Sequence, residues 1–200
     1  TTATAAAALP KAGGTMTGNL ATAGISAVTA GTSNFVAGVN AGNSITSGGN
    51  YNTVVGDEAG TAITTGDNNT AVGYTALDAN TTASNNTAVG RYALTANTTG
   101  GNNTSVGGEA LQSNTTGGNN VAVGYKTLED NTTGTGNSAV GQGALRDNTT
   151  ASSNVAMGKD ALNANTTGSY NTAIGVDSLK TATTVNDLTA VGYTALRDNT

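Results

Sequence analysis

The sequence predicts an all-β fold: a repetitive parallel β-solenoid, or β-roll, with 17-residue coils, assembled as a parallel homotrimer. Three observations lead to this fold class: a repeat of constant length, a glycine at one fixed place in each repeat, and apolar residues that return in the same register. The stretch NNTAVGYTALDANTTAS (residues 68–84) is followed at once by NNTAVGRYALTANTTGG (residues 85–101). Variants of this unit continue to the end of the chain.

The repeat length is measured on the glycine that follows each apolar pair. The first interval between these glycines is 18 residues and every later interval is 17. Few aromatic residues and abundant Gly, Ser, Thr and Asn would otherwise suggest a flexible chain. A flexible chain has no reason to keep this count, whereas stacked coils must keep it. The glycines, which we expect at turns, are Gly38, Gly56, Gly73, Gly90, Gly107, Gly124, Gly141, Gly158, Gly175 and Gly192.

Two apolar positions in each repeat predict the core of the solenoid. One directly precedes the marked glycine, and the other lies four residues after it. Stacking would place like residues above one another at the strand spacing of about 4.8 Å, so that ten coils form a rod of about 48 Å. The first predicted core ladder is Val55, Val72, Val89, Val106, Val123, Val140, Met157, Ile174 and Val191. The second is Leu77, Leu94, Leu111, Leu128, Leu145, Leu162, Leu179 and Leu196.

The main alternative for segments such as TALDANTT is a helix, because Ala and Leu favour helices. A second set of glycines, usually ten residues after the first, argues against it, since each glycine costs a helix about 1 kcal/mol. Asn-Thr-Thr-Gly is also typical of a turn. We therefore expect a strand at TAVG, a tight bend, a second short strand or extended piece around the Ala-Leu pair, and then a turn.

Alanines beside the first ladder predict that several chains associate. Two large apolar side chains cannot order 17 residues, if burial contributes about 25 cal/mol per Å² and each ordered residue costs about 1.5 kcal/mol. Adjacent strand residues point to opposite faces, so small residues there would admit another chain. The alternative is that alanine is merely tolerated on a solvated face. The candidate interchain residues are Ala71, Ala88, Ala122, Ala139, Ala156, Ala173 and Ala190.

The composition argues against most chemical sites. The 200 residues include no Cys, His or Trp, which removes the usual thiolate, imidazole and nucleophile–base arrangements. The seven Lys and Arg and twelve Asp and Glu form no run of one sign, so no nucleic acid is expected. No apolar run reaches the roughly 20 residues of a membrane span. Carboxylates such as Glu109 and Glu129 fall on different coils, without calcium-loop spacing or a glycosidase pair. We expect no enzyme activity, metal, cofactor or membrane insertion.

The polar residues of the turn also form columns. Stacked Asn and Thr side chains would either satisfy the turn backbone and one another, or present a flat array to ice or a glycan. We favour the first interpretation, because adjacent Thr residues on a strand face opposite ways. The Asn column is Asn80, Asn97, Asn114, Asn131, Asn148, Asn165 and Asn199.

The repeat and one upstream element resemble known fibre proteins. NTAVG followed by an Ala-Leu pair and NTTG resembles the glycine-marked repeats of phage tail-fibre shafts. It is also similar to the SVAIG-type repeats in the heads of trimeric autotransporter adhesins, which build parallel β-rolls in threes. LPKAGGTMTGNL (Leu9 to Leu20) resembles the AGGTMTG signature of phage tail fibres and related tail proteins. The adhesin repeat is shorter than 17 residues, so its cross-section is not carried over.

The resemblance implies a function that is mechanical. The chain would be a rigid trimeric shaft segment of a phage tail fibre, extracellular and part of the virion. It would join other tail or baseplate proteins at one end and project a tip that binds a receptor on the bacterial cell surface. We expect the tip outside this sequence, which starts without Met and stops within a repeat. The alternatives are a bacterial surface adhesin head of the trimeric autotransporter type and an ice- or surface-binding solenoid.

The repeats divide the chain into segments. Two early coils carry Gly42 and Gly60 where later coils carry Leu, and they have Ile45 and Ile63 three residues further on. We interpret this as a core side chain that has moved along the coil. Near the other end, Ala-Thr-Thr-Val (182–185) replaces Asn-Thr-Thr-Gly. The predicted segments are an Ala/Thr-rich part with the AGGTMTG element (1–32), two variant transition coils (33–67), and regular repeats that stop mid-repeat (68–200).

Overall fold

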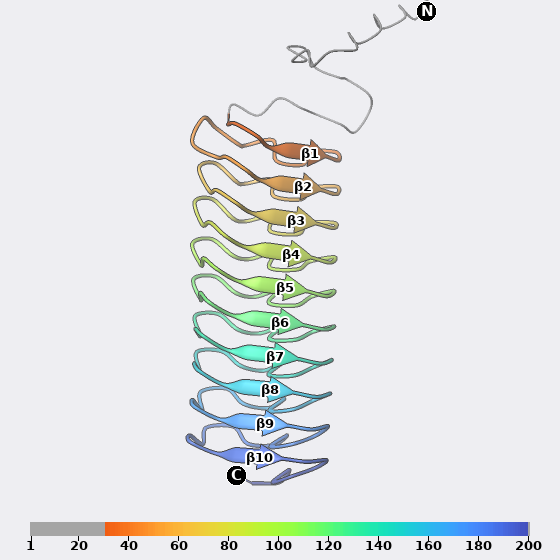
Figure 1. The fold of residues 1–200 in the computed structure, drawn as a ribbon, viewed down its shortest axis with the longest axis vertical. Helices are drawn as coiled ribbons and strands as arrows, with labels where there is room; N and C mark the ends of the chain where they lie inside the picture. Colours follow the sequence, from red (N-terminus) through yellow and green to blue (C-terminus); the bar gives the residue numbers. More distant parts are fainter. Residues whose placement is uncertain (1–30, 200) are drawn as a thin grey trace, which may run out of the picture.

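The computed structural model describes residues 31–199, which form one parallel β-solenoid, as predicted. Each coil contributes one three-residue strand, and the strands stack in chain order into a single parallel sheet (Figure 1). The described residues contain no helix. The strands are β1 (Phe35–Ala37), β2 (Thr53–Val55), β3 (Thr70–Val72), β4 (Thr87–Val89), β5 (Thr104–Val106), β6 (Val121–Val123), β7 (Ser138–Val140), β8 (Val155–Met157), β9 (Thr172–Ile174) and β10 (Thr189–Val191).

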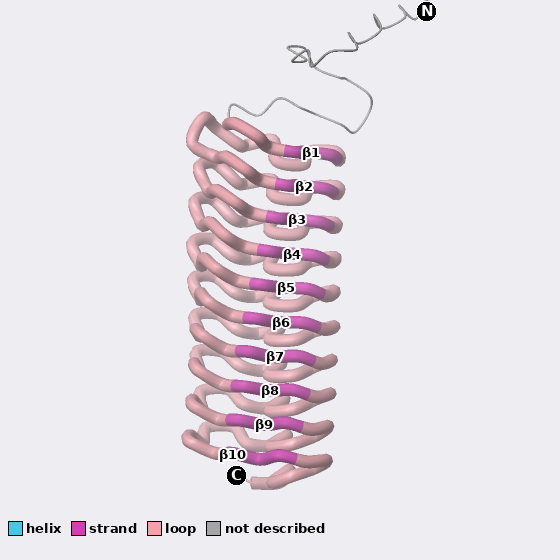
Figure 2. The backbone as a smooth tube through the Cα atoms, in the orientation of Figure 1, coloured by secondary structure: helices cyan, strands magenta, loops and turns pink. Residues whose placement is uncertain are grey.

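The rest of each coil consists of turns and irregular backbone (Figure 2). The expected second strand around the Ala-Leu pair is absent. In the coil of β3, Thr75 and Leu77 take positive φ values of 50° and 55°. A strand needs negative φ at each residue, so two left-handed residues this close together turn the chain. The prediction of a second strand at the Ala-Leu pair is therefore wrong. At Asn-Thr-Thr-Gly, where a turn was predicted, the chain indeed forms no strand.

Backbone hydrogen bonds join each coil to the next on all its sides. In the sheet, Ala71 pairs with Ala88, one repeat later. Outside the sheet, the Leu77 N–H donates to the carbonyl of Ala93 at 3.0 Å, and the Thr98 N–H donates to the carbonyl of Thr115 at 2.9 Å. Because every side of the coil is bonded in register, an inserted residue would break the pattern. This explains the constant repeat length.

The one longer interval is absorbed in a turn. Thr46 bonds to Thr64, 18 residues later, at 2.9 Å. The carbonyls of Gly49 and Gly66 nevertheless play the same part, since each accepts from the amide of an asparagine that precedes a strand. The extra residue therefore lies between Thr46 and Gly49, away from the sheet.

The interior corrects the predicted core. The Leu ladder does lie inside the coil, and Leu77 to Leu179 have no exposed surface. The middle residue of each strand, however, points inward, so the alanines are buried. The third residue, which belongs to the predicted core ladder of Val, Met and Ile, points outward. The physical reason is the narrow cross-section: Leu reaches in from the turn, which leaves room on the strand side only for a methyl group.

This correction applies to two complete sets of predicted residues. The predicted core ladder that instead lies partly or largely exposed is Val55, Val72, Val89, Val106, Val123, Val140, Met157, Ile174 and Val191. The predicted interchain residues that instead lie in the chain's own core are Ala71, Ala88, Ala122, Ala139, Ala156, Ala173 and Ala190.

The marked glycines form a column in which the coils touch backbone to backbone. Their φ values run from 128° to 142°, a region open only to glycine. A Cβ at Gly73 would also lie 2.5 Å from the carbonyl oxygen of Gly90 in the next coil. Any side chain here would push the coils apart.

In the two variant coils, Ile45 and Ile63 are buried. A Cβ on Gly60 would lie 2.8 Å from Cδ1 of Ile63 and 3.3 Å from Cγ1 of Val54. Those two side chains therefore occupy the space that a leucine fills in later coils. The predicted Ala/Thr-rich segment with its AGGTMTG element lies, except for its last two residues, outside the described residues.

Candidate functional site

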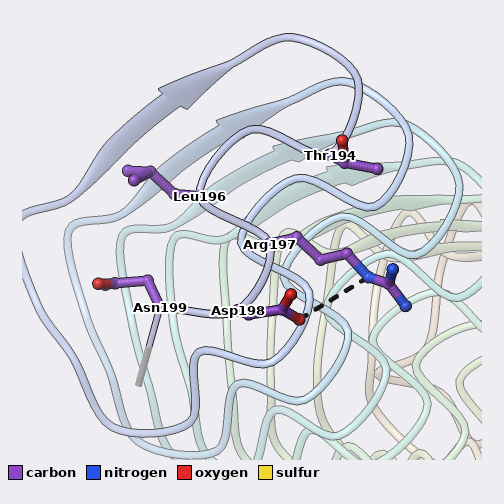
Figure 3. Close-up of a pocket in the computed structure, with 5 residues that line it drawn as sticks. All are labelled: Thr194, Leu196, Arg197, Asp198 and Asn199. Carbon is purple, nitrogen blue, oxygen red and sulfur yellow. Dashed lines mark ion pairs between the residues drawn. The ribbon is translucent and has the colours of Figure 1, made fainter.

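A hollow lies at the end of the stack. Thr194, Leu196, Arg197 and their neighbours Asp198 and Asn199 line it in the last coil (Figure 3). Arg197 Nε lies 3.9 Å from Asp198 Oδ1, and Leu196 is half exposed. The hollow is the flat end of the solenoid, where no further described coil covers the turn, and it brings together no catalytic constellation.

Within residues 31–199, no three Asp, Glu, His or Cys side chains come together in a way that could hold a metal ion. The same range includes no helix of the length and hydropathy needed to cross a bilayer. The remaining candidates are the long surfaces and ladders of the rod itself.

The outward face of the sheet is one of these surfaces. The first and third residue of each strand point outward, and the in-register pairing of the strands aligns them in two columns along the rod. The third-residue column is Val or Ile in most coils, with Ala37 at its start and Met157 near its end. Val123 is 36% exposed and Met157 is 44% exposed, which is high for such side chains. The first-residue column is mostly Thr or Ser, and no strand residue is charged, so this face is neutral, with one apolar column beside one that carries mainly hydroxyl groups.

A buried ladder of asparagines borders the sheet, and the sequence analysis missed it. In the coil of β4, the Asn86 N–H donates to Oδ1 of Asn69 at 3.0 Å, and Asn86 Nδ2 donates to the carbonyl of Gly100 at 3.0 Å. Each amide therefore joins two coils and fastens a turn. The signal was the Asn that precedes the strand in nearly every repeat. The ladder is Asn52, Asn69, Asn86, Asn103, Asn120, Asn137, Asn154 and Asn171.

The predicted ladder of turn asparagines lies inside the coil as well from Asn80 to Asn165, whereas Asn199 in the last coil is only partly buried. Asn97 Nδ2 donates to Oδ1 of Asn80 at 3.0 Å and to the carbonyl of Gly100 at 2.9 Å. The two ladders thus converge on the same carbonyl. The first Thr of each pair also bonds to the backbone, as in the 3.0 Å contact from Thr98 Oγ1 to the carbonyl of Thr115. These contacts agree with the structural interpretation of the polar columns, because the side-chain N–H groups from Asn80 to Asn165 and these hydroxyls already have partners.

Charged residues lie on the turn side of the rod and pair across coils. Lys126 Nζ lies 2.6 Å from Glu129 Oε1 and 3.1 Å from Glu109 Oε2. Arg91 also pairs with Glu109. The hydrogen bonds that Lys126 donates to Glu129 and Glu109 raise its pKa above the ordinary value. Two carboxylates that the sequence placed on separate coils therefore share one lysine, and Lys126 and Arg91 together balance their charge.

A second cluster repeats this arrangement further along the rod. Lys180 Nζ lies 2.8 Å from Asp177 Oδ1 and 3.3 Å from Asp160 Oδ2. The hydrogen bond from Lys180 lowers the pKa of Asp177, and the bond to Asp177 raises the pKa of Lys180. The Lys180–Asp160 pair links neighbouring coils, whereas the Lys180–Asp177 pair lies within one coil. Partly exposed contacts of this kind stabilise a fold only weakly.

The position after each marked glycine forms an exposed rim beside the third-residue column. It varies from coil to coil, which is typical of a solvated surface. Tyr74 and Tyr125 are nearly half exposed there, and Arg91 and Lys159 occupy the same place in other coils. Glu58 is the main cause of a raised pKa at Tyr74. A site repeated along the rod would need the same group in each coil, and this rim does not supply one.

Comparison of the chain with protein-family models, with curated protein sequences and with solved structures finds no match. The assignment of a function therefore depends on the geometry of the rod and on the resemblance of its repeats.

Proposed function

We propose that the chain is a structural fibre protein, a shaft segment of a phage tail fibre that works as a parallel homotrimer. In such a fibre the shaft holds a receptor-binding tip away from the particle and joins tail or baseplate proteins at its other end. The receptor would be a component of the bacterial cell surface, and the shaft would lie outside the cell in the virion.

The observation that carries this proposal is the unbroken backbone ladder from β1 to β10. Coils stacked at about 4.8 Å give a rod of roughly 48 Å for ten coils. Each coil contacts only its neighbours, as in other solenoids, so load passes along the axis through many parallel hydrogen bonds. The charged contacts between coils, such as Lys126 with Glu109, add to the same axial connection.

The interior supports a mechanical function in a second way. The largest buried side chain of a regular coil is one leucine, and much of the remaining space is taken by Ala and hydrogen-bonded Asn. A pair of buried amides in each coil fixes the register, since a coil that slipped would leave those amides without partners. Fixed register is what a spacer of defined length requires.

The alternative that shares this architecture is the head of a bacterial surface adhesin, where the sides of the roll bind a ligand. The two functions differ in where the chain is found and in what its sides contact. Antibodies raised against the full chain are expected to label fibres on phage particles by immunogold electron microscopy. Labelling of the surface of phage-free bacteria would contradict the proposal and favour the adhesin.

A binding assay separates the same two functions with purified protein. The full chain, fluorescently labelled, is expected to show no saturable binding to collagen, to fibronectin or to cultured cells. Saturable binding would contradict a pure shaft function.

A further inference from the structure

We infer that the outward face of the sheet, β1 to β10, is the surface through which copies of this chain pack together, parallel and in register around a common axis. This inference rests on the proposed function, because it names the contact surface of the proposed trimer. The predicted interchain alanines cannot make that contact, since they lie inside each chain's own coil.

The first argument is the chemistry of the face. Its two columns consist of Thr, Ser, Val, Ile, Met, one Ala and one Phe, and no strand carries a charge. The charged residues of the described coils all lie on turns or irregular segments. The third-residue column is an exposed apolar strip that continues from β1 to β10, with mainly hydroxyl side chains beside it and charges only beyond the edges of the sheet. This is the pattern of a protein interface with a polar rim.

The second argument is the shape of the face. Three residues at about 3.3 Å each and ten strands about 4.8 Å apart give a strip of roughly 480 Å². Stable interfaces bury about 800 Å² on each partner. A globular partner would cover only a few coils of so narrow a strip. A partner must therefore run along the full length and extend over the adjoining rim, which only another rod can do.

The third argument is the repeat distance. A rod that matches this face coil by coil must have the same rise, and the chain itself is the molecule with that rise. In a parallel, in-register assembly each residue of the face meets its own copy at the same height. Where the column changes from Val140 to the larger Met157 and Ile174, the same change then occurs at the same height in every copy. A flat lattice such as ice would instead require the same side chain in every coil, and Met157 and Phe35 interrupt the array.

The absence of cysteine from the sequence permits a direct test by disulfide crosslinking of the full chain. We expect Val123→Cys and Val72→Cys to form covalent dimers on mild oxidation, with one chain left unpaired in each trimer. The reason is that disulfides need Cβ atoms about 4 Å apart, which holds only near a shared axis. The matched control is Thr116→Cys, an exposed turn residue on another side of the coil. Crosslinking of Thr116→Cys at the same rate as Val123→Cys would overturn the inference.

The direction of packing is tested with a mixture. Val72 and Ile174 lie at equal distances in the sequence from Val123, toward opposite ends. In an antiparallel pair Val72→Cys chains would crosslink only to Ile174→Cys chains, whereas in a parallel assembly each crosslinks only to itself. A heterodimer as the sole product would overturn the parallel arrangement.

The outcomes also separate this inference from the proposed function. Val123→Asp is expected to reduce the oligomer fraction at least about tenfold, because like charges would meet at the axis, while Thr116→Asp leaves the native mass unchanged. A wild-type trimer whose native mass resists Val123→Asp would overturn the inference and leave the shaft function intact. A wild-type monomer would overturn the inference together with the proposed trimer, while a straight rod by small-angle scattering would still support a spacer. Inhibition of ice recrystallisation by such a monomer would assign the face to ice.

Discussion

In the coil of β2 the interior is filled by Val54 and Ile63 around Gly60, whereas in the coil of β3 it is filled by Ala71 and Leu77, with Asn80 in the place of Ile63. The backbone is almost the same in the two coils. Gly60 and Leu77 occupy equivalent positions with φ values of 53° and 55°. The two regions therefore share one cross-section and fill it with different side chains.

This difference teaches that the volume inside the coil is the fixed quantity, and that the identity of the residues is not. Leucine with positive φ costs about 1–2 kcal/mol relative to a right-handed conformation. Full burial of that leucine stabilises by about 1.5–3 kcal/mol, which offsets the strain. The glycine coil avoids the strain and supplies the missing volume from Val and Ile. Because Ile63 stands where the regular coils have Asn80 and its equivalents, this coil also lacks the side-chain amide that stacks from coil to coil at the turn.

The largest expected effect comes from the feature that both regions share, the column of marked glycines. We expect Gly56→Ala in the first region and Gly90→Ala in the second to destabilise alike, each by about 3 kcal/mol or more. Each Cβ would collide with the backbone of the next coil at a φ that alanine avoids. The measurement is the urea concentration at which the circular dichroism signal is half lost. Gly108→Ala is the control, since the nearest contact of its Cβ would be the ring of Tyr125, at an ordinary 3.5 Å. Equal midpoints for Gly90→Ala and Gly108→Ala would contradict the stacking assignment.

The second prediction converts one region into the other. Leu77→Gly alone should cost about 3 kcal/mol, because it leaves a cavity in the coil. Adding Ala71→Val and Asn80→Ile reproduces the filling of the β2 coil and should restore more than half of that loss. Urea unfolding of the single, double and triple variants measures the coupling between these residues. Simple additivity of the three effects would show that the two fillings are not equivalent.

The third prediction concerns the place where the turn amide ladder stops. Ala182 stands where Asn would continue the ladder, and Oδ1 of Asn165 is buried without a hydrogen-bond donor. Ala182→Asn should supply that donor and stabilise the chain by about 1 kcal/mol. The control is Ala182→Leu, which has a similar shape and no amide. A thermal shift that is the same for both variants would mean that filled volume, and not the hydrogen bond, is responsible.

The smallest effect is the pH dependence of the ion pairs, which lie on the regular coils. The pKa of Asp177 is lowered in the folded chain by Lys180. A lowered carboxyl pKa stabilises the fold above the ordinary pKa of about 4, and this contribution is lost as the pH falls through the folded-state value. Asp177→Asn should therefore unfold slightly earlier than wild type in urea at pH 7, and the two should coincide at low pH. A difference that persists at the lowest pH would assign the effect to packing.

The periodic features of the fold could be predicted from the sequence. The spacing of the glycines required stacked coils, because only in-register backbone bonding keeps such a count. The sequence also predicted the burial of Leu94 and its equivalents and the shift of the core to Ile63. In each case one large apolar side chain of the turn segment can be buried only in the interior of the coil.

The phase of the short strands could not be predicted. In a three-residue strand such as Thr-Ala-Val, side chains alternate between the two faces, so either the alanine or its two neighbours can point inward. A shift of the pattern by one residue exchanges these two arrangements. Hydrophobicity favours Val inside, but the leucine that reaches in from the turn leaves room only for alanine. The Asn86 ladder was missed for a related reason: a buried amide in every coil looks like a turn residue until its partners in the neighbouring coils are known.

The central claim is that both kinds of coil belong to one continuous rod, and amide hydrogen exchange followed coil by coil tests it most directly. The Thr53 N–H donates to the carbonyl of Asn69 at 2.8 Å, and the Thr70 N–H donates to the carbonyl of Asn86 at the same distance, so bonding continues across the junction of the two regions. We expect strand amides from β2 to β9 to be protected to a similar degree and to lose protection together as urea is added. Rapid exchange at Thr53 and Thr70 while β4 to β8 remain protected would contradict the claim.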